Sequence, residues 1–389
     1  MNVRRHALNT LSILAVVAAA VALTSCAEDP AGIFSRVVNE KPISNNMTKA
    51  LQYSSPSFVA RLGDSYYAGV GVFWAKADGQ ANWTNEVTLP AAFGSATVLA
   101  GSGTVVGGTM YVLFTDSLTG NGLGVWSTAN GTDWTKVAGL PTDRYIRSIM
   151  AANGTLFAIA ANGRSTSDAA AYSIYYLDGG SFVASSIADS AAIGLPSSVA
   201  YVSGSYWFAA GAALVSGASA GALSVAATEP PSGDSSYSGV CAYDSGVIVS
   251  TRTGYLNYYD GAAWTSAGPF VNAKDKVFSL SEPTYVASDK VLLVGTNMKP
   301  RGSSDTPPVD GYLEFDLSGG FSAAIAPLAA HSIVSDATNF AASLSGTSIT
   351  SMPSFDLGGG KRRIFALTDG VGPWSNTYEN GAWGGWVRE

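Results

Sequence analysis

The sequence has very few residues of the kinds that build zinc sites or nucleophilic dyads. Its 389 residues include two histidines, His6 and His331, and two cysteines, Cys26 and Cys241. Structural zinc needs several thiolate or imidazole ligands, and a Cys or Ser nucleophile usually needs a nearby histidine. We therefore expect no cofactor and no metal. Calcium held by loop carboxylates around Asp305–Asp310 is the alternative, but no D-x-D-x-D-G run supports it.

Charge and helical periodicity are also scarce. Charged residues make up 13% of the chain, whereas aromatic residues reach 11% and glycine occurs 44 times. A disordered chain shows the opposite balance of charge to aromatic residues. No stretch of a dozen residues has a convincing 3.6-residue period, and short apolar runs alternate with Gly, Asp, Asn and Ser. The composition predicts an all-β protein.

The first 25 residues have the pattern of a secretory leader. Arg4 and Arg5 are followed by an apolar run, Leu11–Leu23, which is too short to span a bilayer comfortably. We therefore expect residues 1–25 to be a signal peptide and not a membrane anchor.

The leader ends in Leu23-Thr24-Ser25-Cys26, an apolar residue, two small residues and a cysteine. This segment resembles a bacterial lipobox, in which the signal peptidase cuts before the cysteine and its thiol carries a diacylglycerol. The resemblance implies lipidation of Cys26 and a lipidated tether over residues 26–52. An ordinary secretory peptide with a chance cysteine is the alternative.

The expected mature chain is acidic. Removal of residues 1–25 leaves 19 basic and 28 acidic side chains, a net charge of about −9. Such a chain lacks the cationic surface that releases counterions from phosphate backbones, so we expect no nucleic acid partner. Direct electrostatic binding to anionic lipid is equally disfavoured. Cys241 would then be the one remaining free thiol, a small buried hydrophobe in an apolar strand.

One type of segment recurs along the chain. In each copy small polar residues are followed by apolar residues, and the segment ends at Gly, Asp or Asn. Equivalent apolar positions in its copies are Phe58, Val98, Ile149, Val199, Val240 and Val286, with a poorer seventh copy at Ser348–Asp356. The steps of roughly 40 to 51 residues match the period of four-stranded propeller blades. We therefore predict one β-propeller domain over residues 53–389, with seven blades of four antiparallel strands.

Most units also carry an aromatic pair around a tight turn, and the C-terminal segment shows this best. Arg362–Asp369, Val371–Glu379 and Trp383–Glu389 are predicted strands, separated by Asp-Gly and Asn-Gly turns. The fourth unit, about Leu195–Gly233, lacks the pair, and we expect it to be the least regular. We also expect Trp383 and Trp386 to be buried where the last blade meets the first.

One turn, Ser127–Trp134, resembles the Asp-box S-x-D-x-G-x-x-W of sialidase-like propellers. Ser127, Gly131 and Trp134 match, whereas Ala129 replaces the aspartate. The resemblance implies a structural hairpin on the outer part of a blade. A sialidase would also need an arginine cluster with a tyrosine and an acid, which the sequence does not show.

Three arginines, Arg61, Arg144 and Arg147, lie at or near predicted innermost strands. These strands line the central channel of a propeller, where an arginine could bind a carboxylate or a sugar acid. Pairing with the neighbouring acids Asp64 and Asp143 is the alternative.

Together the lipobox, the seven-fold meander and the final W-G-G-W give the whole chain a resemblance to bacterial β-propeller lipoproteins of unknown function, of the spirochaete type. The resemblance implies a monomer anchored by lipid in the cell envelope, at the outer membrane and on its periplasmic or surface face. We expect a non-enzymatic module that binds an envelope protein or a glycan. A carbohydrate-active propeller, either glycosidase or lyase, and an envelope-assembly scaffold are the alternatives.

Cys26→Ser should abolish membrane attachment and leave the fold intact, because the predicted propeller lies entirely downstream. Labelling with a palmitate analogue and detergent phase partitioning measure the attachment. Label that persists in the variant would contradict the lipobox assignment.

Overall fold

The computed structural model describes Leu51 and residues 54–389, apart from 85–86, 94–97, 119, 121, 163–170, 228–236, 273–274, 297–310, 329–343, 345–346 and 380–381. All of the described residues belong to one compact unit, Ala50–Glu389. The expected leader, Cys26, the tether and the calcium candidate at Asp305–Asp310 lie outside the described residues.

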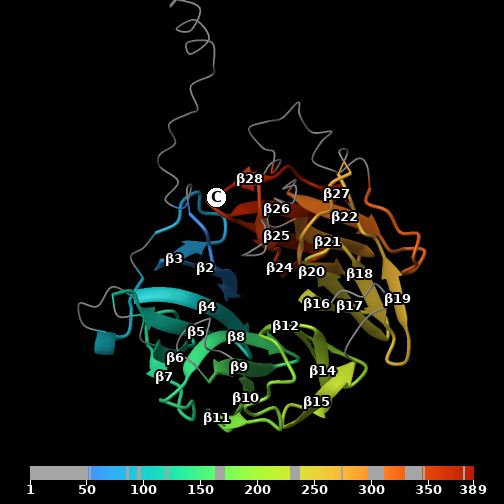
Figure 1. Ribbon diagram of the computed structural model, residues 1–389. Coiled ribbons are helices and arrows are strands. Elements are labelled where there is room, and N and C mark those ends of the chain that lie inside the picture. Colours follow the sequence, from blue (N-terminus) through green and yellow to red (C-terminus); the bar gives the residue numbers. More distant parts are fainter. Residues whose placement is uncertain are drawn as a thin grey trace, which may run out of the picture. The chain divides into compact units, whose positions relative to one another are not determined.

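Seven antiparallel sheets follow one another in chain order (Figure 1). The innermost strands are β1 (Phe58–Leu62), β4 (Val98–Val106), β8 (Tyr145–Ala152), β12 (Pro196–Val202), β16 (Tyr237–Tyr243), β20 (Leu280–Val286) and, in two pieces, β23 (Ile349–Ser351) and β24 (Ser354–Gly358). The second strands are β2 (Ser65–Val70), β5 (Thr109–Asp116), β9 (Thr155–Ala161), β13 (Ser205–Ala210), β17 (Gly246–Thr251), β21 (Val291–Thr296) and β25 (Lys361–Thr368).

The outer half of each sheet is less uniform. The third strands are β3 (Val72–Ala77), β6 (Gly122–Thr128), β10 (Tyr172–Asp178), β14 (Ala213–Ser219), β18 (Leu256–Tyr259), β22 (Tyr312–Asp316) and β26 (Trp374–Glu379). The outermost are β7 (Thr135–Lys136), β11 (Ser181–Ala184), β15 (Ala222–Ala227), β19 (Trp264–Ala267), β27 (Ala382–Trp383) and β28 (Val387–Arg388). A 3-10 turn, η1 (Ala91–Phe93), lies between the first two sheets.

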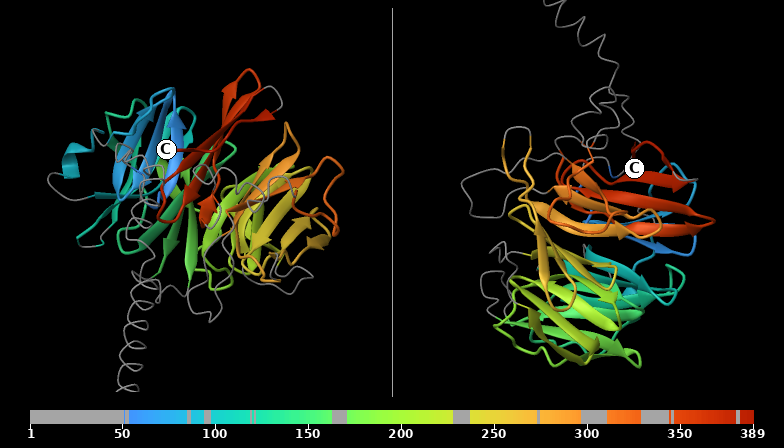
Figure 2. Two further views of the ribbon diagram at one scale, coloured as in Figure 1. Left: turned by 90° about the horizontal axis from the view of Figure 1, so that it is seen from above. Right: turned by 90° about the vertical axis from the view of Figure 1, so that its right-hand side faces the viewer.

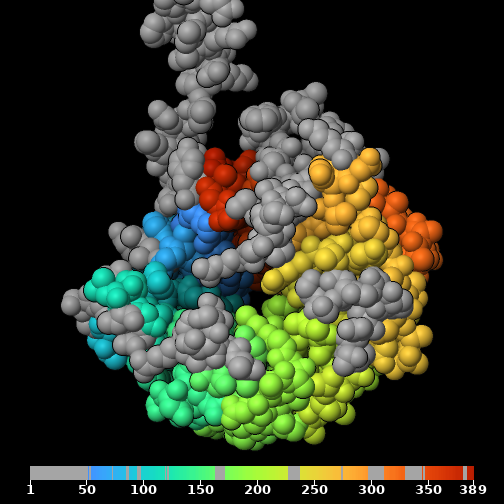
Figure 3. Space-filling model, in the orientation of Figure 1, coloured from blue at the N-terminus to red at the C-terminus, as the bar shows by residue number. Residues whose placement is uncertain are grey.

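The seven sheets form a ring, because each buries both faces against its neighbours. There are seven buried apolar clusters, one for each pair of adjacent sheets. The cluster that contains Tyr66 and Phe365 joins the first sheet to the seventh and closes the ring. Figure 2 shows consecutive sheets side by side in both turned views, and in Figure 3 the blue and red ends of the unit are in contact. The protein is a seven-bladed β-propeller, as the sequence predicts.

The repeat read from the sequence identifies the innermost strand of every blade, but its equivalent positions share one strand register only on β8, β12 and β16. Phe58, Val98 and Val286 lie at other distances from the turn that ends their strands. The equivalent positions, from Phe58 to Val286, all lie on innermost strands, and the poorer seventh copy contains β23 and the first residues of β24. Five of the six equivalent residues are buried, and Val199 packs half-buried against a cluster. These positions recur because each innermost strand presents an apolar residue to the neighbouring sheet.

The expectation that the fourth unit is the least regular is only partly right. Its sheet has four paired strands, whereas the first and sixth sheets have three. Two register shifts between β14 and β15 are its irregularity. Leu214, Val215 and Leu223 are fully or almost fully buried there, so aliphatic packing replaces the missing aromatic pair.

In the described part of the chain no added strand closes the ring; closure uses side chains and one backbone hydrogen bond, from the Gly372 amide to the Ser54 carbonyl at 2.9 Å. β1 pairs with β2, while β23 to β28 form the seventh sheet among themselves. A buried ion pair crosses this junction, with Lys76 Nζ bonded to Glu389 Oε2 and side chains 7% and 5% exposed. Arg363 Nη1 also lies 2.7 Å from Asp78 Oδ1, and Trp83 packs edge-on to Phe365 at 6.5 Å.

The expectation that Trp383 and Trp386 lie at this junction is wrong. Both are half-buried and pack against the cluster shared with the sixth sheet. Trp386 Nε1 donates a hydrogen bond to the Tyr312 hydroxyl at 3.2 Å, and the Trp383 ring lies 4.9 Å from that of Tyr378. Trp83, from the first unit, is the tryptophan buried at the closure.

Glu389→Gln should lower the free energy of unfolding by about 3 kcal/mol, because it leaves the Lys76 ammonium buried without its counter-charge. The matched control is Glu379→Gln. Glu379 pairs with Lys361 at 3.3 Å, but the side chains are 53% and 41% exposed, so its loss should cost less than about 1 kcal/mol. Urea unfolding measures the free energy of unfolding of the two variants and of the wild type.

Replacement of both members of the buried pair, Lys76→Met with Glu389→Leu, should recover most of the loss. Equal effects of the buried and exposed substitutions would show that the ion pair does not contribute to closure.

Candidate functional site

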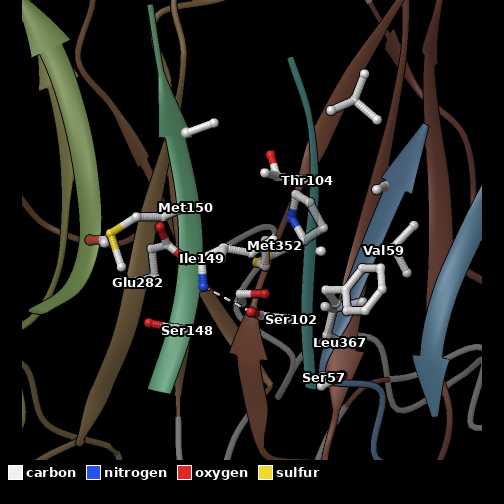
Figure 4. Close-up of a pocket in the computed structure, with 18 of the residues that line it drawn as sticks. Ser57, Val59, Ser102, Thr104, Ser148, Ile149, Met150, Glu282, Met352 and Leu367 are labelled. Atoms are coloured by element: carbon white, nitrogen blue, oxygen red, sulfur yellow. Dashed lines mark hydrogen bonds between the residues drawn. The ribbon is translucent and has the colours of Figure 1, made fainter. Parts of the chain in front are cut away.

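The innermost strands enclose a cavity of about 760 Å3 at the centre of the ring (Figure 4). Its walls come from β1, β4, β8, β12, β20 and the β23–β24 segment. Hydroxyl groups dominate the polar surface, among them those of Ser57, Ser102, Thr104, Ser148, Ser197, Ser198, Thr284, Ser351 and Ser354. A cavity of this size suits a small ligand or a few residues of a peptide.

Several of these hydroxyls join one innermost strand to the next. Ser102 Oγ accepts a hydrogen bond from the Ile149 amide at 2.9 Å, shown dashed in Figure 4. Ser198 Oγ does the same for the Val240 amide at 2.7 Å, and Thr284 Oγ1 donates to the Met352 carbonyl at 2.9 Å. Backbone groups that no sheet partner satisfies would be costly in such a wall. These serines and threonines are therefore part of the scaffold of the cavity.

β-bulges recur at corresponding places in six of the seven innermost positions, on β4, β8, β12, β16, β20 and β23. A bulge sets two residues against one and changes where a side chain points. On β20 the shift lies between Leu280 and Pro283 and contains Ser281 and Glu282. The bulge is thus the local feature that directs the Glu282 side chain into the cavity.

Glu282 is the one carboxylate among the described residues that line this cavity. It is half-buried, and its burial raises the pKa of the carboxyl from 4.5 to about 7. Met150 on β8 and Met352, between β23 and β24, line the same cavity as Glu282 (Figure 4). Two acids on different blades would be required for glycosidase chemistry. This cavity offers one.

Gly239 on β16 makes room for Glu282. A Cβ atom at Gly239 would lie 2.7 Å from Glu282 Cα and 2.9 Å from its Cβ and Cγ. The next residue but one, Cys241, is a free cysteine. Burial, and then the nearby Glu282 charge, raise the pKa of the Cys241 thiol above its usual range, so the thiol stays protonated.

Of the three arginines expected at the channel, Arg61 lines this cavity. Its Nη1 donates to the Asp356 carbonyl at 3.0 Å, and its Nη2 lies 3.5 Å from Asp64 Oδ1. The guanidinium is therefore held at the closure of the ring, with 24% of the side chain exposed.

The structure does not bring Arg144 and Arg147 into the same cavity. Arg144 lines a separate groove between the second and third sheets. Its two terminal nitrogens, Nη1 and Nη2, each donate to one carboxylate oxygen of Asp189, with Nη2 2.8 Å from Oδ2. The hydrogen bond from Arg144 lowers the pKa of Asp189. Arg147 is the bulge residue of β8, and its guanidinium lies 4.7 Å from the centre of the Tyr145 ring. Arg144 thus pairs with a distant acid and not with Asp143.

The turn that resembles an Asp-box closes the β6–β7 hairpin. Asn130 Oδ1 accepts from the amides of Thr132 and Asp133, both at 2.9 Å, so Asn130 caps the turn one position after Ala129. Gly131 has a φ of +80°, and a Cβ there would lie 2.2 Å from the Tyr67 hydroxyl.

Ser127 and Trp134, the other two residues that match the Asp-box pattern, donate side-chain hydrogen bonds to backbone carbonyls. Trp134 Nε1 donates to the Thr88 carbonyl at 2.7 Å, and its ring packs edge-on to Phe73 of the first sheet. Ser127 Oγ donates to the Thr135 carbonyl at 3.3 Å. These contacts place the turn against the first blade, away from the cavity.

Sequence reasoning missed Glu282, Met150 and Met352 as site residues. The available signal was an acid inside the sixth copy of the repeat, where the second to fifth copies carry serine or glycine. No described group of three His, Cys, Asp or Glu side chains could hold a metal ion. Within the same residues, no helix is long and apolar enough to cross a membrane.

No protein-family model matches this chain, and no curated protein matches it. Solved structures do resemble it. One, described as YCF48 bound to D1 peptide, has a TM-score of 0.57 and 12% identity over 86% of this chain and 95% of its own. An ancestral GH74 enzyme has a TM-score of 0.54 and 13% identity over 85% of this chain and 48% of its own. At such identities the likeness shows the fold alone.

Glu282→Gln should stabilise the protein at pH 8 and have little effect near pH 4.5. The folded-state pKa of about 7 exceeds the unfolded value of 4.5, so ionisation of Glu282 costs folding free energy. That cost is absent below pH 4.5, grows as the pH rises to about 7, and should reach about 1–3 kcal/mol above it. Thermal melts of both proteins across this range measure it. Parallel stability curves for the two proteins would contradict the prediction.

Proposed function

We propose that this chain is a non-enzymatic binding propeller whose central cavity holds a segment of a protein partner. The observation that carries the proposal is the cavity itself, which combines hydroxyl groups, two methionines and a single carboxylate. Methionine side chains adapt to varied apolar groups, and hydroxyls can donate or accept hydrogen bonds. Such a surface suits recognition better than bond cleavage.

The neighbour described with a bound D1 peptide supports a peptide ligand, since it has the same architecture over most of both chains. The likeness to a GH74 enzyme supports the second candidate, a carbohydrate-active propeller. A glycosidase of the usual kind needs two carboxyl groups about 5–9.5 Å apart. Glu282 has no described carboxylate beside it in the cavity, so binding is the better supported function.

We further propose that a lipid on Cys26 anchors the propeller to the bacterial cell envelope as a monomer. The lipobox-like Leu23–Cys26 supports the anchor. The monomer is supported by closure of the ring within one chain, where the seventh sheet packs on the first. The expected partner is an envelope protein, and a role in envelope assembly is compatible with this.

Thr104→Trp should abolish binding to the cavity without unfolding the ring. Thr104 is half-buried on the cavity wall, and an indole there would fill space that the ligand needs. The control is Ser219→Trp on β14, an exposed position outside the cavity. Soluble Ala27–Glu389 would be screened against envelope proteins, peptides and glycans.

Peptide or protein ligands that bind wild type and Ser219→Trp, but not Thr104→Trp, would support the proposal. Ligands restricted to glycans would favour the carbohydrate alternative. Partner binding that is unaffected by Thr104→Trp would overturn the role of the cavity.

A further inference from the structure

Glu282 is a half-buried carboxylate, and no described side chain pairs with it. Arg61, the other charged residue on the cavity wall, is already bonded to the Asp356 carbonyl and Asp64. Burial alone accounts for the raised pKa of Glu282, with no opposing cation contributing. Burying a carboxylate without a partner is unfavourable.

The fold nevertheless builds this position in two separate ways. A bulge on β20 places Glu282 out of the regular register. Gly239 on the adjacent β16 leaves the space that the Glu282 side chain occupies. Two innermost strands therefore combine to hold an acid where apolar residues or serines would be less costly.

We propose that Glu282 recognises a cationic side chain, the ammonium of lysine or the guanidinium of arginine, on a protein segment that enters the central cavity. This inference rests on the proposed function and names the chemical class of its ligand. A buried carboxylate gains most from a charge-assisted hydrogen bond, because the surrounding dielectric is low.

The surroundings of Glu282 match the rest of such a side chain. Met150 and Met352 provide flexible apolar surface for the methylene stem of lysine or arginine. The hydroxyls of Thr104 and Ser148 line the same cavity and can bond to the backbone of the segment. The acidic balance of the chain, 28 acidic against 21 basic residues, favours approach of a cationic partner.

Binding should depend on pH through Glu282. The titratable or charged groups that face it are the Cys241 thiol on β16 and, on the cavity wall, Arg61 on β1. Its raised pKa keeps the thiol neutral between pH 5 and 8, so it adds no charge there. Only ionised Glu282 attracts a cation, so affinity should fall as the pH drops below 7.

The test uses an acetylated hexapeptide library in which each member has a counterpart with glutamine in place of lysine or arginine. Wild-type Ala27–Glu389 should select lysine- or arginine-containing members over their glutamine counterparts. Glu282→Gln should weaken these peptides at least tenfold at pH 8 and remove the pH dependence. Glu379→Gln, an exposed acid outside the cavity, is the control and should bind like wild type.

The remaining outcomes separate this inference from the proposed function. If glutamine counterparts bind equally well, and Thr104→Trp abolishes that binding, the cavity binds peptides but the cation inference is wrong. If affinity survives Glu282→Gln, the inference is also wrong. If no peptide binds in a Thr104-dependent manner, both proposals fail. Melting curves show whether Glu282→Gln is folded, independently of binding.

Discussion

Burial of both faces of every sheet is the constraint on which this structure depends. An antiparallel sheet with two apolar faces can avoid water only if a neighbour covers each of them. Here seven apolar clusters each lie between two sheets, so every sheet relies on its neighbours to cover its apolar faces. The ring must close, and the contact between the first and seventh sheets becomes as important as any within a blade.

A buried ion pair lies at the closure of the ring. Lys76 and Glu389 lose their hydration together, in an environment where an unpaired charge would be severely destabilising. Tyr66, Trp83 and Phe365 surround this region with aromatic contacts. An ion pair specifies which surfaces meet, since a slipped arrangement would leave both charges buried alone.

The central cavity follows from the same packing. Innermost strands converge on the axis, where bulges interrupt the regular pairing and serine hydroxyls accept hydrogen bonds from backbone amides of the next strand. Most of the polar groups there are consequently used by the scaffold. Glu282 has no such structural role, and this sets it apart as a group available to a ligand.

The sequence alone determined the architecture, because local patterns carry it. Alternating apolar runs, Gly and Asp turns and a period of roughly 40 to 51 residues each reflect contacts within one blade. The innermost positions from Phe58 to Val286 could therefore be identified in advance. The lipobox-like segment is equally local and stays a prediction about residues outside the described structure.

Contacts between blades were decided only by the tertiary structure. The sequence could not pair Lys76 with Glu389, 313 positions apart, or show that Trp386 packs on Tyr312 instead of at the closure. It grouped Arg61, Arg144 and Arg147 because all lie near innermost strands, yet Arg144 turns away to bind Asp189. The direction of a side chain in a wall of bulged strands depends on the neighbouring strand, as Gly239 shows for Glu282. Such long-range geometry leaves no periodic trace in the sequence.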